Sequence, residues 1–126
     1  MKQEDKDLLL RDLCARLPYE VIISYDDGDT IEDRVMGLGS LHDFMFSNAI
    51  IMPYLRPMSS MTDEEIGEFE KIVDIIGREN EIKSYDTFGV DAIDYLLAHH
   101  FDVRNLLEKG LALEAPEGMY GKEDLV

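Results

Sequence analysis

The stretch IIMPYLRPMSSMTDEE, residues 50–65, divides the chain into a part rich in strand-forming residues and a part rich in helix-forming residues. Pro53 and Pro57 each hold φ at about −65°, remove a backbone donor and disfavour helix in the residue before them. We therefore predict that this link (residues 50–65) is extended and belongs to neither a helix nor a central strand.

The end of the link carries a helix-start signal. Thr62 is followed three residues later by Glu65, so each side chain can accept a hydrogen bond from the other residue's amide, which is a capping box. The apolar spacing that follows predicts a helix over residues 63–78. Its apolar stripe should lie on the sheet and consists of Ile66, Phe69, Ile72, Val73 and Ile76.

Before the link, the sequence predicts one helix and a small sheet. A helix over residues 5–16 would bury Leu10, Leu13, Cys14 and Leu17 and turn Asp7, Arg11 and Asp12 to solvent. Two runs of strand formers, 20–25 and 30–38, flank Asp26-Asp27-Gly28-Asp29, and Asp-Gly between such runs predicts a hairpin. A third strand is expected over residues 44–51.

Beyond the link, residues 79–87 are polar and predict a connection to another helix. Its apolar stripe comprises Val90, Ile93, Leu97 and His100. The sequence His99-His100-Phe101-Asp102 predicts a corner, where Asp102 caps a short further helix that ends at Gly110. We expect a short extended return at residues 111–113.

These elements together predict a single α+β domain over residues 1–116, followed by a frayed tail over residues 117–126. The domain would hold a small antiparallel sheet, a hairpin plus a third strand, packed by about four helices. A short helical bundle that carries an isolated hairpin is the alternative fold.

The chain has 12 basic and 28 acidic residues, a formal charge of −16. This charge disfavours direct binding to nucleic acid and to anionic membranes, since both normally use Lys/Arg clusters. It is compatible with a basic partner protein, or with a DNA mimic that inhibits a nucleic-acid enzyme, or it serves solubility alone. An apolar remainder on the second face of the sheet would favour a homodimer.

The single cysteine, Cys14, precludes an intramolecular disulfide, and we expect it to be a small buried thiol. The N-terminus lacks the uninterrupted apolar run of a signal peptide, and no segment is long and apolar enough to span a membrane. We therefore expect a cytoplasmic protein.

No residue pattern predicts a catalytic, metal or cofactor site. His99 and His100 are adjacent and would point about 100° apart on a helix, unlike the i,i+4 pair of a helical zinc site. A general base made of either imidazole with Asp102 is conceivable, but a histidine at a helix end is more often structural. The acids around Gly28 fit a solvated turn better than a calcium loop. A small enzyme with a His/Asp pair is kept as an alternative.

The link is the stronger candidate for function, as a surface for a protein partner. Tyr, Met and Arg are enriched in protein interfaces. The candidate partner-binding residues are Tyr54, Leu55, Arg56, Met58 and Met61 in the link and His99, His100 and Asp102 at the corner. The competing interpretation is that the methionines and Leu55 clamp the link onto the core while Arg56 pairs with a local carboxylate.

Three blocks of the sequence resemble a family of small uncharacterised proteins encoded by gut bacteria and their prophages. The blocks are PYLRPMSSMT at 53–62, LCARLPY at 13–19, and AHHFD at 98–102 with LLEKGLALEAP at 106–116. The resemblance carries over no catalytic residue. It implies a mobile-element or phage context and favours a binding role directed at a host or phage protein.

Overall fold

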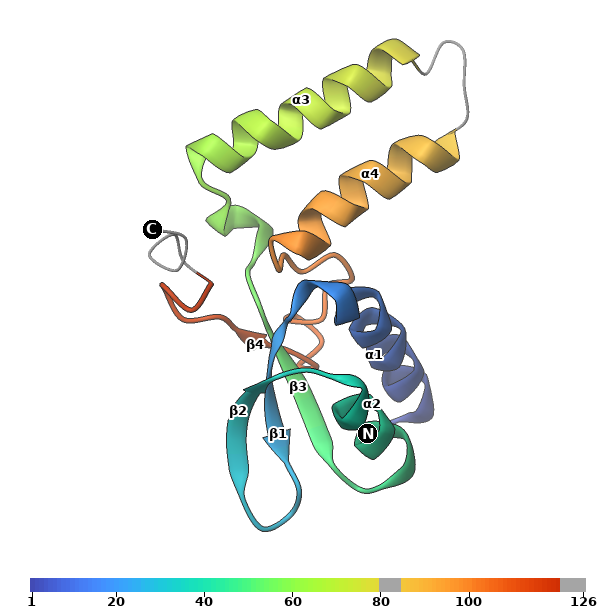
Figure 1. The fold of residues 1–126 in the computed structure, drawn as a ribbon, viewed down its shortest axis with the longest axis vertical. Coiled ribbons are helices and arrows are strands. Elements are labelled where there is room, and N and C mark those ends of the chain that lie inside the picture. The colour runs from blue at the N-terminus through green and yellow to red at the C-terminus, as the bar shows by residue number, and fades with distance from the viewer. Residues whose placement is uncertain (80–84, 121–126) are drawn as a thin grey trace.

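The computed structural model describes the backbone of residues 1–79 and 85–120. Within these ranges it also describes the side chains, except those of residues 74–79 and 85–90. Its elements are α1 (Gln3–Arg16), β1 (Ile22–Asp26), β2 (Ile31–Val35), α2 (Leu38–Phe46), β3 (Ile50–Leu55), α3 (Asp63–Glu79), α4 (Tyr85–Ala98) and β4 (Leu113–Glu114), with short 3₁₀ turns at Leu17–Tyr19 and Met58–Ser60. Helices α1 and α2 pack on one face of the sheet, while α3 and α4 project away from it (Figure 1). The predicted α+β class, with a small sheet and four helices, is confirmed.

The sheet has the strand order β2-β1-β3-β4. Strand β1 is antiparallel to both neighbours, and β4 runs parallel to β3 over two residues, so the sheet is mixed. The hairpin is confirmed. Gly28 takes φ of +100° in its turn, and the Asp27 carboxylate accepts hydrogen bonds from the amides of Asp29 and Thr30, which lower the Asp27 pKa. The acids around Gly28 therefore build a turn.

The prediction of a third strand over residues 44–51 is wrong, because α2 runs to Phe46 and β3 begins at Ile50. Leu41 and Phe44 are both buried and lie three residues apart, which places them on the same side of a helix.

The exclusion of a central strand from the link is also wrong, since β3 lies between β1 and β4. The carbonyl of Leu55 accepts a hydrogen bond from the amide of Ala115, so the backbone groups of Leu55 point toward β4. The backbone groups of Pro53, two residues earlier, point toward the same side. Strand β4 starts opposite Tyr54, so it does not reach Pro53. The missing N–H of Pro53 therefore costs the sheet no hydrogen bond.

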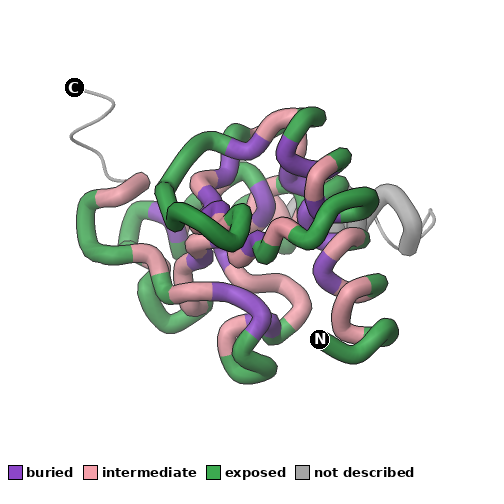
Figure 2. The backbone as a smooth tube through the Cα atoms, turned by 90° about the horizontal axis from the view of Figure 1, so that it is seen from below, coloured by how far each residue is buried: buried purple, intermediate pink, exposed green. Residues whose placement is uncertain are grey.

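Buried residues gather at the centre of the molecule, where the sheet meets α1, α2 and residues 106–112 (Figure 2). The predicted inner face of α1 is confirmed for Leu13, and Leu10 and Leu17 are partly buried against the core, but it is wrong for Cys14 and for Asp12, which was expected to face solvent. The helix buries Leu9, Asp12, Leu13 and Arg16, whereas Cys14 is exposed. A charged pair therefore occupies half of the buried face of α1, which an apolar pattern cannot reveal.

Helix α3 begins at the predicted capping box. The amide of Glu65 donates to Thr62 Oγ1 at 3.2 Å, and the amide of Thr62 donates to Glu65 Oε1 at 2.9 Å. The predicted contact of α3 with the sheet is wrong, because α3 packs along α4, with the Phe69 ring centroid 5.8 Å from that of Tyr95.

Ile66 and Val73 of α3 remain 39% and 38% exposed. The predicted roles of Ile76 and Val90 lie outside the described side chains. In the described part of the chain, no helix has the length and apolarity needed to cross a membrane.

Helix α4 ends with a left-handed residue, His100, at φ of +66°. The amides of His100 and Phe101 donate to the carbonyls of Leu97 and Leu96, the hydrogen-bond pair that closes a helix in a Schellman motif. The predicted corner is therefore present. The short helix predicted after Asp102 is not formed, because residues 103–110 make turns and Asn105 has φ of +60°.

Gly110 closes these turns at φ of +74°, and the extended return forms as β4 at Leu113–Glu114, two residues later than the predicted start at 111.

Candidate functional site

Arg56 ties the link to both helices of the projecting pair. Its guanidinium donates to both carboxylate oxygens of Glu65 at 2.7 and 2.6 Å, and to the carbonyls of Ser60 and His99 at 3.2 and 3.4 Å. It also lies 4.2 Å from the ring centroid of Phe101. The Arg56 side chain is 18% exposed, and both of its terminal nitrogens donate hydrogen bonds within the chain.

Glu65 is the acidic centre of this cluster. Hydrogen bonds from Arg56 lower the pKa of Glu65 to about 2, and the capping-box amide of Thr62 adds to the effect. Nδ1 of His99 lies 3.3 Å from Glu65 Oε2, and the His99 ring stacks on Tyr95 at 4.2 Å. His99 therefore faces Glu65 and not Asp102.

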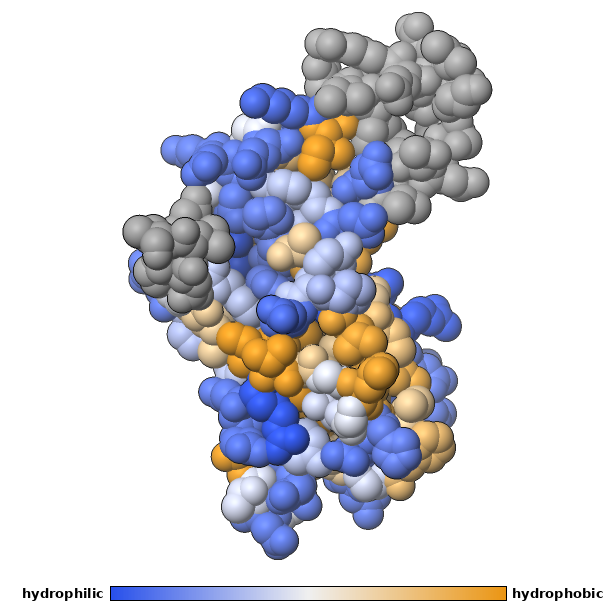
Figure 3. Space-filling view, in the orientation of Figure 1, coloured by the Kyte–Doolittle hydropathy of each residue, from blue (hydrophilic) through white to orange (hydrophobic). Residues whose placement is uncertain are grey.

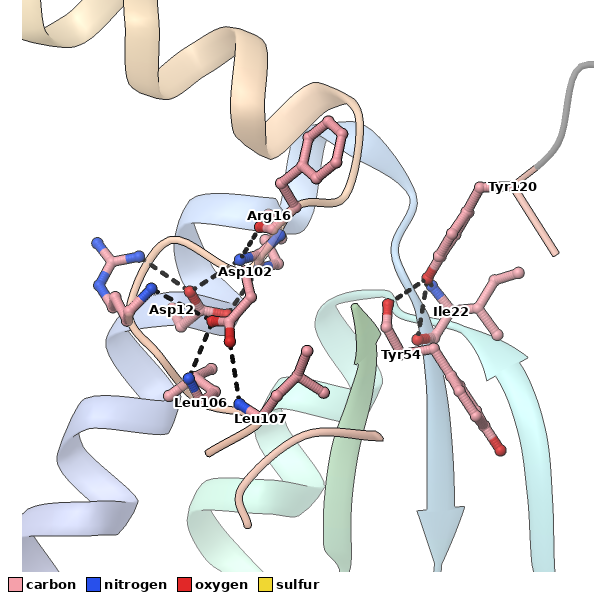
Figure 4. Close-up of polar contacts among 10 residues, drawn as sticks. Asp12, Arg16, Ile22, Tyr54, Asp102, Leu106, Leu107 and Tyr120 are labelled. Atoms are coloured by element: carbon pink, nitrogen blue, oxygen red, sulfur yellow. Dashed lines mark hydrogen bonds and ion pairs between the residues drawn. The ribbon is translucent and has the colours of Figure 1, made fainter. Parts of the chain in front are cut away.

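His100 and Asp102 point in different directions from the corner. The His100 ring stacks on Tyr120 at 3.7 Å, and burial lowers its pKa to about 4. The carboxylate of Asp102 accepts hydrogen bonds from three backbone amides, those of Arg104, Leu106 and Leu107, at 3.3, 2.9 and 3.0 Å (Figure 4). Among the described residues, no hydrogen bond or ion pair joins Asp102 to either histidine. The fold thus does not assemble the His/Asp pair.

A buried ionic cluster lies behind the corner. Asp12 accepts from Arg16 Nε at 2.6 Å and from Arg104 Nη1 at 2.9 Å, and Arg16 Nη2 donates to the carbonyl of Phe101 at 2.8 Å (Figure 4). The side chains of Asp12 and Arg16 are fully buried. Sequence reasoning missed this cluster, although the i,i+4 spacing of Asp12 and Arg16 is that of a helical ion pair.

Tyr120 closes the end of the sheet. Its hydroxyl accepts from the amide of Ile22 at 2.7 Å and donates to the carbonyl of Tyr54 at 2.9 Å, which joins β1 to β3 (Figure 4). Burial raises the pKa of Tyr120 to about 12. The prediction of a tail that frays from residue 117 is therefore wrong as far as Tyr120, and residues 121–126 lie outside the described part.

The sheet face opposite α1 and α2, here called the open face, is rich in apolar side chains. Its members follow from strand register and from the alternation of side chains along a strand: Ile22, Ser24, Asp26, Ile31, Asp33, Val35, Ile50, Met52, Tyr54 and Leu113. Ile31, Val35 and Ile50 are 70%, 56% and 54% exposed. Figure 3 shows apolar side chains gathered around the sheet and hydrophilic ones along the described part of α3.

The predicted partner-binding residues of the link separate in space. Tyr54 lies on the open face, where its hydroxyl donates to Asp33 Oδ1 at 2.9 Å. Leu55 is fully buried in the core, Met58 is 44% exposed, and Met61 is half-buried.

In the sequence, three consecutive charged residues, Glu32, Asp33 and Arg34, separate Ile31 from Val35, so neither face of this strand is uniformly apolar. This strand therefore carries no alternating signal that could have identified the open face.

Within the described residues, no group of three His, Cys, Asp or Glu side chains could hold a metal ion. Comparison with known proteins finds no matching family model, curated protein or solved structure.

Proposed function

We propose that this protein is a non-catalytic, cytoplasmic protein-binding module of a phage or mobile element, and that the open face is its contact surface. The observation that carries the proposal is the exposure of Ile31, Val35 and Ile50 on one face of the sheet. Exposed apolar side chains that gather on one face are typical of interaction surfaces. The free thiol of Cys14, which is exposed, suits a reducing compartment.

Charge defines the chemistry of the partner. Asp26 and Asp33 lie among the apolar residues of the open face, and the whole chain carries −16. A partner surface with an apolar centre and a rim of Lys and Arg would complement both features, and the opposite charges would speed association.

The test is capture of partners from a bacterial lysate on the immobilised protein, read by mass spectrometry. Ile50→Lys places a charge on the open face without changing β2, and we expect it to lose the partner. Leu38→Lys is the matched control, because Leu38 is 73% exposed on α2 and lies outside the open face. Both variants should keep the wild-type circular dichroism spectrum. Equal capture by wild type and Ile50→Lys would contradict the proposal.

The acidic surface favours a second candidate, a DNA mimic that inhibits a nucleic-acid enzyme. The same capture experiment separates the two. A nucleic-acid enzyme that is released by salt and retained by Ile50→Lys would favour the mimic, because electrostatic contacts are screened by salt and apolar contacts are not. Salt-resistant capture that depends on Ile50 would favour the open face.

A further inference from the structure

We propose that two copies of this chain associate through the outer edge of β2, antiparallel about a two-fold axis at Asp33. The inference goes beyond the proposed binding role, because the second copy contacts the β2 edge and is not the basic partner proposed for the open face. Within the described residues, no strand pairs with this edge of β2, and all five residues of β2 are exposed.

The hydrogen bonds of the hairpin show which backbone groups of β2 are available. The amide of Asp27 donates to the carbonyl of Thr30, and the amide of Met36 donates to that of Val21, so hydrogen-bonded pairs fall on even positions of β2. Because pairs alternate in an antiparallel ladder, the N–H and C=O groups of the odd positions, 31, 33 and 35, point to the outer edge. Pairing centred on Asp33 matches all of these groups with those of a second copy.

The charges of β2 favour the same register. With the axis at Asp33, Glu32 of each copy lies opposite Arg34 of the other, in a non-hydrogen-bonded pair where side chains approach most closely. A shift of the axis by one position in either direction would place Glu32 opposite Glu32, or Arg34 opposite Arg34. Either shift therefore loses both Glu32–Arg34 pairs and adds a like-charge pair, whereas the register centred on Asp33 has two opposite-charge pairs against the single Asp33–Asp33 pair.

The open face supports the register on the other side of the sheet. Ile31 of one copy would lie opposite Val35 of the other, which covers two of its most exposed apolar side chains. The two copies of Asp33 meet at the axis, but the Tyr54 hydroxyl binds the Asp33 carboxylate from β3, on the far side of β1. This hydrogen bond draws the carboxylate away from the edge. The dimer would join two open faces into one continuous surface.

Sedimentation equilibrium of the purified protein tests the inference without any other protein present. We expect the mass to rise from 14.4 kDa toward twice that value as concentration increases, and to rise more readily at high salt, because the chains repel each other through their net charge. Arg34→Glu should weaken association at least tenfold. The double variant Glu32→Arg, Arg34→Glu should restore it, because each charge again meets its opposite.

Disulfide trapping tests the register. In a Cys14→Ser background, Asp33→Cys would place two thiols at the axis, with Cα atoms about 5.5 Å apart, within the range of a disulfide. Ile31→Cys is the control, since its two copies would lie four residues apart along the strands, about 14 Å. We expect covalent dimer from Asp33→Cys and little from Ile31→Cys.

A wild type that stays monomeric at several hundred micromolar would overturn the inference, as would equal trapping by the two cysteine variants or failure of the charge swap to restore association. None of these results would bear on the proposed binding role of the open face. That role is tested by the capture experiment with Ile50→Lys, a variant that does not alter β2. The two proposals can therefore fail separately.

Discussion

Removal of the Asp12 carboxylate by Asp12→Ala would test whether the buried ionic cluster holds the domain together. The variant deprives Arg16 of its anionic partner while the guanidinium stays fully buried, with the Phe101 carbonyl as its remaining hydrogen-bond acceptor among the described residues. Arg104 loses its ion pair with Asp12 as well.

The magnitude follows from the difference between breaking and replacing a buried pair. An uncompensated buried charge typically costs about 3–5 kcal/mol. A domain of this size has an unfolding free energy of about 5–15 kcal/mol, so we expect Asp12→Ala to lose a large part of its stability. Replacement of both partners, as Asp12→Leu with Arg16→Met, should recover part of the loss, because no unpaired charge then remains on α1.

Urea unfolding followed by circular dichroism measures these free energies. Asp7→Ala is the matched control, because Asp7 lies on the same helix and makes an exposed hydrogen bond with Gln3, so we expect a change within about 0.5 kcal/mol. A loss below about 1 kcal/mol for Asp12→Ala would refute the reasoning, since it would mean that Arg16 finds water or another partner at no cost.

Two further predictions concern the contacts of Tyr120. The pKa of His100 is about 4 in the folded protein and 6.5 for an ordinary histidine, so on acidification the unfolded chain binds a proton before the folded chain does. The contribution of His100 to the unfolding free energy should be fully present above pH 6.5 and should be lost as the pH falls toward 4. We expect a loss of about 1–2 kcal/mol, less than the full pKa shift implies, because the ring is partly solvated. Urea titrations should show a shallower fall for His100→Asn, which cannot titrate and tolerates positive φ, and an unchanged slope would exclude His100 as the source. Tyr120→Phe removes the hydroxyl that joins β1 to β3 and should lower the unfolding free energy by about 1–3 kcal/mol. Tyr19→Phe is the control and should change it very little, because the Tyr19 hydroxyl makes no hydrogen bond within the described part. Equal losses of unfolding free energy in the two variants would contradict the bridging role.

Local signals were the ones that predicted the fold well. The capping box of Thr62 and Glu65, the Asp-Gly turn and the corner after α4 each depend on a few neighbouring residues, and each was confirmed. Such motifs satisfy their own hydrogen bonds, so distant parts of the chain have little influence on them.

Features that depend on distant partners were the ones that sequence reasoning missed. Asp12 is buried because Arg104, far along the chain, approaches it, and no pattern within α1 encodes that approach. Pro53 is tolerated in β3 because β4 stops short of it. Tyr120 was assigned to a frayed tail because its hydrogen-bond partners lie in β1 and β3.

Distant partners also determine where the candidate partner-binding residues lie. Arg56, His99 and Asp102 have the chemistry of an interface, but the fold uses each of them inside the chain. Arg16 and Arg56, from two of the blocks on which the resemblance was predicted, both contact Phe101 from the third. The fold alone would account for such a resemblance, so the blocks need not mark the partner's surface. We propose instead that a partner contacts groups that the fold leaves exposed, such as those of the open face and the β2 edge.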